Sequence, residues 1–476
     1  MRKYILFIVL FSVISANMNC FAQSTSDPVE NFEAMWNLYD KNYALFAPKN
    51  IDWDLIYQLY RPKVNAGTTN EELFNILSNM LEHLNDNHVN LRSTNPNRRF
   101  NAGILNRMTM DDFSLDLIRR KYLNNEYDQK LTNFTYGWLT DEIGYFHFRN
   151  FRNPEASGKA TDEIIEYFKD AKGMVIDVRN NGGGDDWAGK AIADRFADRQ
   201  RLYMKTFERN GPGHEDFDPP KYFYIEPNGK KQFTKPVILL THRFSISAAE
   251  NFALAMRVLP HVTVVGDFTS GVFADVYGDR LPNGWSVSIS FKKFVDCNDF
   301  CWEGIGVPMD LRIVNTEDDI ENGTDRILDF AVDLINSGEI ELQNEDDSLK
   351  DIRESLARTL DQNIAERGIE YGLQEFNRKR SGDPASWYID RREMEDLARK
   401  LDRSGNPEQA IEVVKLNIQA HPEDYRTYFH LAALYKEQGN TELAKENYRR
   451  TLELNRRSYP WEKEAYETAK NYIDRY

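Results

Sequence analysis

The centre of the chain alternates between short apolar runs and amphipathic segments, and this alternation limits the folds available to it. Three runs have the length and the β-branched content of strands, namely "GMVIDVR" from Gly173, "PVILLT" from Pro236 and "VTVVGDF" from Val262. The helical patterns "WAGKAIADRFADR" and "SAAENFALAMRVL" separate them. Strands that alternate with helices build a parallel or mixed sheet covered by helices. We therefore predict an α/β domain over residues 101–316, with further strands in "DFSLDLI", "IGYFHFRNF" and "SVSISF".

The segment before this domain has a helical pattern. Apolar residues recur at spacings of three and four in "NFEAMWNLYDKNYALF", "WDLIYQLYRPKV" and "EELFNILSNMLEHL". Thr69 and Glu72 have the spacing of a capping box, which marks the start of the third helix. These patterns predict a small helical-bundle domain over residues 23–100.

Beyond residue 316 the chain is charged and almost wholly helical in pattern. We expect a linker helix over residues 317–347 and an all-α domain over residues 348–476. In that domain "RSGNPEQAIEVV" aligns with "EQGNTELAKENY" at a period of 34 residues, which matches Gly405 to Gly439 and Ala410 to Ala444. The repeat resembles the tetratricopeptide repeat, and this resemblance implies a small solenoid that binds a protein partner.

The amino terminus, "MRKYILFIVLFSVISANMNCFAQS", has the basic, apolar and small-residue parts of a secretory signal. We predict a signal peptide over residues 1–22, cleaved after Ala22, because its apolar run is shorter than the roughly 20 residues that a spanning helix needs. The protein is then exported to the periplasm or the extracellular space and has no transmembrane span. A lipid anchor on Cys20 is the alternative, disfavoured by the preceding Asn19.

Two cysteines remain after cleavage of the signal peptide, Cys297 and Cys301 in "VDCNDFCWEG", and export would place them in an oxidising compartment. A cysteine pair in an oxidising compartment usually forms a disulfide, which we predict here. A metal site would need further ligands, and no histidine lies nearby in the sequence, so we expect neither a metal nor another cofactor. The net charge of −16, with acidic and basic residues interspersed, argues against nucleic acid as a partner.

Several hydroxyl groups follow the strand that starts at Pro236, in "THRFSISAAENFALA". A serine at the start of a helix lies beside the first free backbone N–H groups, which can stabilise an oxyanion. Serines at this place also cap helices routinely, so Ser245 and Ser247 taken alone favour capping. The G-x-S-x-G elbow of many serine hydrolases is absent.

Three consecutive glycines, Gly182, Gly183 and Gly184, follow the strand at Gly173 in "DVRNNGGGDD". Glycine permits unusual backbone angles and the close approach of a ligand, as a backbone oxyanion hole or a peptide-docking edge requires. The run does not have the pattern of a phosphate-binding loop.

These blocks occur in a definite order: "LNDNHVNL", "GMVIDVRNNGGG", "FSISAAENFALA", "VVGDFTSG", "LPNGW" and "EGIGVPMD". Together they resemble the tail-specific or C-terminal processing serine peptidases. The resemblance implies a catalytic domain with a fold like that of Clp protease and crotonase. It also implies that the nucleophile is Ser247, three residues before Glu250.

One departure from this pattern indicates a branch of the family. The bacterial processing peptidases use a lysine base at the position of Val272, and no lysine lies between Met256 and Gly284. The tricorn branch instead uses a histidine from the amino-terminal part together with a glutamate. The matching residues here are His88 and Glu303, with Asn87 where that branch has another small polar residue.

Histidine suits the role of base because its pKa lies near neutral pH. We predict that His88 activates Ser247 and that Glu303, directly or through Asn87, orients the imidazole. The backbone N–H groups of Gly183 and Ala248 are the candidates for the oxyanion hole, and Gly182, Gly184 and Gly271 are the candidates for substrate binding. His242 and His261 are nearer to Ser247 in sequence, but no motif supports them.

Two other functions compete with an exported serine endopeptidase that cleaves protein or peptide substrates. The first is a catalytically inactive binding or scaffold protein that acts through its helical repeats. The second is an acyl-coenzyme A enzyme of the crotonase type, which export argues against. The processing peptidases often carry an inserted PDZ domain, for which this chain has no room, so we expect the repeats to recruit substrate. Asp185 and Asp186 either favour basic substrate residues or cap a helix.

Overall fold

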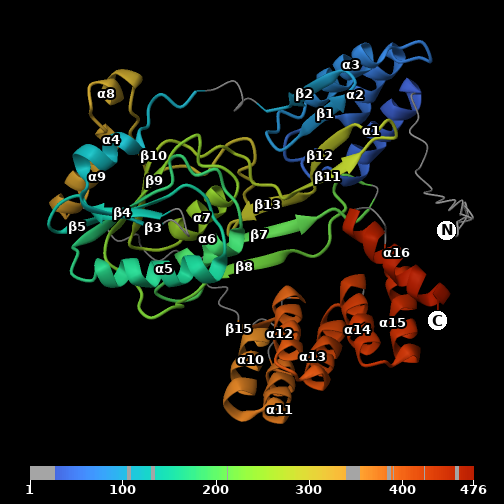
Figure 1. The fold of residues 1–476 in the computed structure, drawn as a ribbon. Helices are drawn as coiled ribbons and strands as arrows, with labels where there is room; N and C mark the ends of the chain where they lie inside the picture. The colour runs from blue at the N-terminus through green and yellow to red at the C-terminus, as the bar shows by residue number, and fades with distance from the viewer. Residues whose placement is uncertain are drawn as a thin grey trace, which may run out of the picture.

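Figure 1 presents the computed structural model, which describes residues 27–103, 109–129, 134–211, 213–338, 354–382, 387–389, 391–422, 424–455 and 460–475. The predicted signal peptide and Cys20 lie outside the described residues. The chain forms an amino-terminal unit, a central α/β unit and a carboxy-terminal helical unit. In this view the helices of the last unit lie below the hairpin of β7 (Arg201–Glu208) and β8 (Lys221–Ile225).

The central unit is built on a seven-stranded mixed sheet. Its strand order is β14 (Leu311–Arg312), β10 (Val262–Gly266), β9 (Val237–Thr241), β6 (Gly173–Asp177), β5 (Ile143–Phe148), β4 (Phe134–Trp138) and β3 (Asn124–Gln129). The five strands from β14 to β5 are parallel, whereas β4 and β3 are antiparallel. The α/β fold class and the three buried strands predicted from the sequence are confirmed.

Helices cover both faces of this sheet, which explains why its strands are apolar throughout. Along β6 and β9, alternate side chains pack on opposite faces. One face contacts α5 (Pro154–Tyr167), α6 (Asp186–Ala193) and α7 (Ala248–Arg257), and the other contacts α9 (Arg326–Ser337). A short helix, α8 (Glu317–Glu321), precedes α9.

The strand predicted in "DFSLDLI" is wrong. This segment forms α4 (Leu115–Leu117), which continues into a π-helical turn over Ile118–Tyr122. The hydroxyl of Ser114 accepts a hydrogen bond from the N–H of Leu117 at 3.2 Å and so caps a helical start. The capping bond and the burial of Ile118 against the α9 side of the sheet outweigh the local strand pattern.

A second, three-stranded antiparallel sheet flanks the central unit. Its order is β13 (Lys292–Asp296), β7 (Arg201–Glu208) and β8 (Lys221–Ile225). The predicted disulfide is not formed, because Cys297 and Cys301, just after β13, are both free thiols. The turn between them is instead closed by the carboxylate of Asp296, which accepts the N–H groups of Asn298 and Phe300, each at 2.9 Å.

The amino-terminal unit contains the three predicted helices, α1 (Pro28–Asn42), α2 (Trp53–Tyr60) and α3 (Asn70–Glu82). The capping box is present, since Thr69 N–H donates to the Glu72 carboxylate at 2.8 Å. The unit also holds a four-stranded sheet of β11 (Val276–Arg280), β12 (Ser286–Ser290), β1 (Asn90–Thr94) and β2 (Asn97–Asn101). The β11–β12 hairpin comes from the central segment of the sequence, so it ties the two units together.

The carboxy-terminal unit is all-helical apart from two very short strands, β15 (Glu354–Ser355) and β16 (Trp387–Tyr388). Its helices are α10 (Leu356–Arg367), α11 (Ile369–Arg380), α12 (Arg391–Arg403), α13 (Pro407–Ala420), α14 (Tyr425–Glu437), α15 (Thr441–Leu454) and α16 (Pro460–Arg475). The aligned glycines Gly405 and Gly439 end α12 and α14 with nearly equal φ angles of 79° and 75°. The two halves of the sequence repeat therefore end their first helix with the same glycine conformation.

Candidate functional site

Ser247 stands at the junction between β9 and α7. It is the N-cap of α7 and has φ 58° and ψ −122°, a backbone conformation that is costly for any residue with a β-carbon. Its N–H donates to the carboxylate of Glu250 at 3.1 Å, and its side chain is only half-buried. The strained backbone is thus held in place, with the serine at the first turn of the helix.

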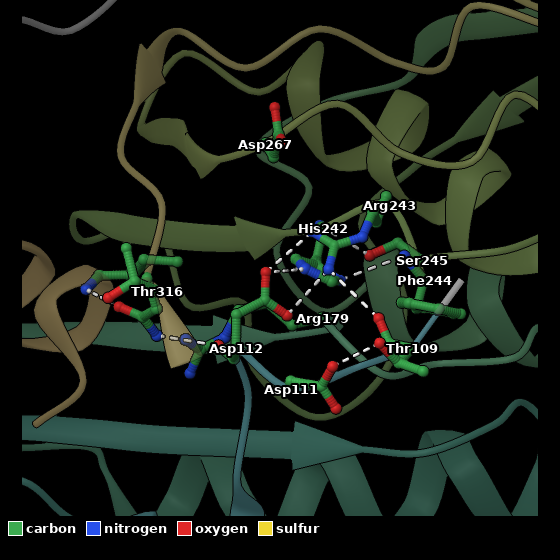
Figure 2. Close-up of polar contacts among 12 residues, drawn as sticks. Thr109, Asp111, Asp112, Arg179, His242, Arg243, Phe244, Ser245, Asp267 and Thr316 are labelled. Atoms are coloured by element: carbon green, nitrogen blue, oxygen red, sulfur yellow. Dashed lines mark hydrogen bonds and ion pairs between the residues drawn. The ribbon is translucent and has the colours of Figure 1, made fainter. Parts of the chain in front are cut away.

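Ser245 has a structural place instead. It is fully buried, its hydroxyl donates to the carbonyl of Val178 at 2.7 Å, and it accepts the N–H of His242 at 3.1 Å. Figure 2 shows Ser245 beside His242 and Arg243. Of the two serines weighed from the sequence, Ser247 is the one whose side chain reaches solvent.

The glycine turn lies directly against Ser247. Gly183 has φ 85°, and a β-carbon added to it would be 2.8 Å from the Ser247 β-carbon and 3.1 Å from the Ala248 nitrogen. Ala248 supplies the first N–H of α7, for which the described residues show no acceptor. The N–H of Gly183 donates to the side-chain oxygen of Asn181 at 2.9 Å, so that bond would have to yield before this N–H could bind an oxyanion.

The other two glycines of the turn differ from each other. Gly184 has φ 138°, and an added β-carbon would stand 2.2 Å from the Phe151 carbonyl oxygen. Gly182 is exposed and has open space where a β-carbon would be. The backbone therefore requires glycine at positions 183 and 184 but not at 182.

The sequence motif identifies Glu250 only by its position three residues after Ser247. In the structure its carboxylate accepts hydrogen bonds from several parts of the site. It is fully buried, and besides Ser247 it accepts Thr269 Oγ1 at 2.7 Å, Gly271 N–H at 2.6 Å and Val272 N–H at 2.7 Å. Burial raises its pKa to about 7, while these donors act in the opposite direction. Glu250 thereby fixes the loop after β10 to the turn that carries Ser247.

Gly271 and Val272 have structural environments. An added β-carbon on Gly271 would stand 2.6 Å from the Ile305 nitrogen, and the N–H of Gly304 donates to the Gly271 carbonyl at 2.7 Å. The Val272 side chain is buried. The loop after β10 therefore packs against the loop that carries Glu303, and its predicted substrate-binding glycine is enclosed by that contact.

Glu303 is bound to the residues that follow Val272. Its Oε2 accepts the N–H groups of Phe273 at 2.9 Å and Ala274 at 3.3 Å. Burial and the nearby charge of Asp86 raise the pKa of Glu303 to about 8. The N–H groups of one short segment, residues 271–274, thus bind both carboxylates. The first two bind Glu250, which also holds Ser247, and the last two bind Glu303.

The amino-terminal unit supplies His88, from the turn between α3 and β1. Its N–H donates to Asp86 at 2.8 Å, and its carbonyl accepts Ser288 Oγ from β12 at 2.6 Å. Burial lowers the pKa of His88, while the charges of Asp86 and Asp275 raise it. At neutral pH the imidazole is therefore uncharged, as a general base must be.

Two acidic residues connect His88 with the region of Ser247. Asn251, one helical turn after Ser247, donates to Asp186 at 3.0 Å. Asp275 raises the pKa of both His88 and Asp186, so its carboxylate lies close enough to act on each. Burial is the larger cause for Asp186 and brings its pKa to about 7. Asp275 is thus coupled through its charge both to His88 and to Asp186 at the start of α6.

The predicted relay from His88 to Glu303 is not formed as a direct bond. Within the described part of the chain, His88 Nδ1 and Glu303 Oε1 are both buried without a hydrogen-bond partner. The side chain of Asn87 lies over Gly103, where an added β-carbon would come within 2.0 Å of the Asn87 side-chain oxygen. Asn87 therefore packs against the end of the first β-hairpin.

The alternative histidines are occupied or remote. Both ring nitrogens of His242 are engaged, Nε2 with Asp112 at 3.0 Å and Nδ1 with the N–H of Phe244 at 3.2 Å. Figure 2 shows the Asp112 carboxylate bound by both His242 and Arg243, and Arg243 donates to it at 2.8 Å. His261 precedes β10, whereas Ser247 follows the parallel strand β9, so they lie at opposite ends of the sheet.

Asp86 and Asp275 are residues of this site that sequence reasoning missed. Asp86 is buried and accepts Tyr43 Oη at 3.0 Å and Ser290 Oγ at 2.8 Å, in addition to the N–H of His88. Its position two residues before His88 was the available signal. Asp185, in contrast, caps α6 by accepting the N–H of Trp187 at 2.9 Å. Among the described residues, no group of three histidine, cysteine, aspartate or glutamate side chains is arranged to hold a metal.

Known families and solved structures match two parts of this chain. Residues 142–313 match the model of "Peptidase family S41", and residues 26–82 match that of the "Tricorn protease C1 domain". A crystal structure of a putative peptidase from Parabacteroides merdae ATCC 43184 is 34% identical, with a TM-score of 0.60, over 65% of this chain and 97% of that one.

Two curated relatives match over shorter stretches. Carboxy-terminal processing protease CtpB of Bacillus subtilis (strain 168) is 30% identical over 33% of this chain and 31% of its own length. The chloroplastic C-terminal processing peptidase of Tetradesmus obliquus is 26% identical over 37% of this chain and 36% of its own length. The chain thus spans about a third of each of these relatives.

The solved peptidase is similar over nearly its whole length, and the matched segment contains Ser247, the glycine turn and Glu303. This chain belongs to peptidase family S41.

Proposed function

We propose that the protein is a serine endopeptidase that cleaves protein or peptide substrates through an acyl-enzyme on Ser247. In this reaction the Ser247 hydroxyl attacks the scissile carbonyl carbon, and His88 accepts the hydroxyl proton. His88 then returns the proton to the leaving amine, and water, activated by the same imidazole, hydrolyses the ester.

One observation carries this proposal. Ser247 has a strained backbone at the start of α7, directly against the Gly183 turn and next to the N–H of Ala248, which has no acceptor among the residues that the structure describes. A helix-capping serine does not require a strained backbone or a glycine packed against it. A nucleophilic serine beside oxyanion donors is expected to have both features. The uncharged, buried imidazole of His88, brought in by the amino-terminal unit, supplies the base.

In this mechanism the oxyanion is stabilised by Ala248 N–H and, once its bond to Asn181 is exchanged, by Gly183 N–H. Glu303 is proposed to orient His88 in the loaded enzyme; among the described residues His88 Nδ1 and Glu303 Oε1 are both buried without a hydrogen-bond partner, which leaves each available for this contact. The reaction uses no metal or organic cofactor.

The remaining parts of the proposal concern location and substrate delivery. The signal-like amino terminus supports export to the periplasm or the extracellular space. None of the helices among the described residues is both long and apolar enough to span a bilayer. The paired helices of the carboxy-terminal unit, similar to tetratricopeptide repeats, would recruit the protein substrate or a partner.

The competing function is that of a binding or scaffold protein with an inactive site. This function is favoured by the hydrogen bond from the Gly183 N–H to the side chain of Asn181. Because of this bond, the Ala248 N–H is the one candidate oxyanion donor among the described residues that is not already bonded.

Labelling with a fluorophosphonate probe separates the two functions. The peptidase predicts that wild type is labelled and that Ser247→Ala and His88→Ala are not, while all three unfold at similar temperatures. Equal labelling of wild type and Ser247→Ala would refute Ser247 as the nucleophile, and no labelling of folded wild type would favour the scaffold function.

A further inference from the structure

A cavity of about 500 Å³ separates the three-stranded sheet from the carboxy-terminal helices. The sheet side consists of the end of β7, the residues leading into β8, and Lys292 at the start of β13. The helical side is formed mainly by α14 and the turn before it. Apolar and aromatic wall residues come from both sides, namely Pro219, Pro220, Tyr222, Ile389, Pro422 and Tyr425.

The cations in the cavity wall are already engaged. Arg426 donates to Asp424 at 2.8 Å, and Arg391 lies 3.2 Å from the same carboxylate. Lys292 turns away to Asp275, with a nitrogen-to-oxygen distance of 2.6 Å. Lys221 lies over the rings of Trp187 at 5.6 Å and Phe223 at 5.2 Å. Each of these four cationic side chains therefore already has an acidic or aromatic partner.

The carboxylate of Glu208, also in the cavity wall, has none of these cations as a bonded partner. It pairs with Lys292 in the β7–β13 register, but the lysine amine is committed to Asp275, and within the described residues no hydrogen bond or ion pair reaches the Glu208 side chain. Burial raises its pKa, as do the charges of Asp218 and Glu462 in the same wall, while Arg426 and Lys292 lower it through their charges. The cavity therefore presents an unmatched anionic group, which a cationic ligand would neutralise.

We propose that this cavity is a subsite for a lysine or arginine side chain of the polypeptide substrate, with Glu208 as the acceptor of its charge. Such side chains combine an aliphatic stem, suited to the proline and tyrosine walls, with a cationic head. This inference rests on the proposed function, which it deepens by naming a substrate class.

The cavity is also near the candidate catalytic residues. Lys292, in its wall, is paired with Asp275, and Asp275 acts on His88. Lys292 thus shares an ion pair with a carboxylate whose charge also acts on the imidazole. In the proposal, a substrate bound at Ser247 places a neighbouring side chain in the cavity, so the subsite would select cleavage sites near basic residues.

The test uses the full chain carrying Ser247→Ala, which binds without cleaving. Binding of a fluorescein-labelled, unstructured lysine–alanine peptide is measured by anisotropy. The comparison peptides replace each lysine by norleucine, which keeps the stem without the charge, or by glutamate. We expect the lysine peptide to bind about fivefold more tightly than the norleucine peptide at low salt, and this preference to shrink as salt is added.

Glu208→Gln should abolish the preference for lysine, and Glu208→Lys should transfer it to the glutamate peptide. Glu215→Gln, an exposed carboxylate in the same connection between β7 and β8, is the matched control and should keep the preference. Removing an unpaired buried carboxylate should not lower the unfolding temperature, so loss of folding does not explain loss of binding.

A lysine preference that survives Glu208→Gln, or no preference in the Ser247→Ala protein, would overturn the proposal. Fluorophosphonate labelling of wild type and Glu208→Gln provides an independent arm. Failure of wild type to label would refute the peptidase function while leaving the binding result interpretable.

Discussion

Gly183 and Ser247 are packed so closely that a β-carbon on the glycine would stand 2.8 Å from the β-carbon of the serine. This contact joins the turn after β6 to the turn after β9, the two neighbouring strands of the central sheet. Both turns follow the carboxyl ends of parallel strands, where α/β proteins commonly bind ligands. A larger residue at position 183 would therefore disturb the backbone that carries Ser247.

Gly183→Ala should reduce fluorophosphonate labelling by roughly a hundredfold, a loss comparable to that of an oxyanion donor. The reason is that the added carbon would push Ser247 and the Ala248 N–H apart, at a φ of 85° that alanine disfavours. Gly182→Ala is the control, because it has open space for the same carbon and lacks a positive φ. Similar labelling rates in both variants would contradict the proposed role of the turn.

The two serines should respond in opposite ways to alanine substitution. Ser245→Ala should destabilise the protein by about 1–3 kcal/mol, since the Val178 carbonyl and the His242 N–H lose a buried partner. Labelling of folded Ser245→Ala should persist. Ser247→Ala should lose labelling with little change in stability. Urea unfolding and probe incorporation, measured on the same preparations, check both; abolished labelling in a stable Ser245→Ala protein would argue against Ser247 as nucleophile.

The pH dependence should reflect a histidine with a lowered pKa. Burial disfavours the imidazolium, so His88 stays neutral below its ordinary pKa and the acid limb of the labelling rate should have its midpoint below pH 6.5. Asp275→Asn should move the midpoint lower still, because the carboxylate stabilises the charged form. Asp141→Asn, at an exposed site, serves as control. A midpoint unchanged in Asp275→Asn would remove Asp275 from the surroundings of His88.

A buried ion pair anchors α9 beneath the site. Arg179 contacts Asp325, the N-cap of α9, at 2.9 Å, and both side chains are fully buried. Asp325→Ala should lower the free energy of unfolding by about 3–5 kcal/mol, because it leaves a guanidinium buried with one partner fewer. Exposed Glu317→Ala, in the neighbouring helix α8, should change it by no more than about 0.5 kcal/mol. Equal effects in chemical denaturation would show that the pair is not an anchor.

The carboxy-terminal unit should matter for large substrates only. Deleting the chain from Ser348 onward should slow processing of a protein substrate, since the repeats would no longer recruit it. Hydrolysis of a short peptide without basic residues should be spared, and fluorophosphonate labelling of the truncated protein confirms that its site is intact. Equal losses on both substrates would exclude a recruitment role.

Local patterns predicted much of the fold. Continuous apolar runs indicated β6, β9 and β10 because strands covered on both faces have no polar side, and the Thr69 capping box marked the start of α3. The failures were also local. "DFSLDLI" has a strand-like pattern, but the Ser114 cap and the tertiary burial of Ile118 make it helical. The cysteine pair predicted a bridge, whereas Asp296 closes that turn without one.

The sequence by itself determined the family-like order of blocks, the candidate Ser247 and the absence of a lysine at Val272. It could not determine distances between segments, because those depend on how the chain returns on itself. Tertiary structure decided that β12 pairs with β1, which ties the unit carrying His88 to the central segment of the chain. It also decided that Asp86, Asp275 and Glu208 face the site or its neighbouring cavity. The physical reason is that burial and charge act through space, so a carboxylate acquires its role from neighbours that the sequence separates.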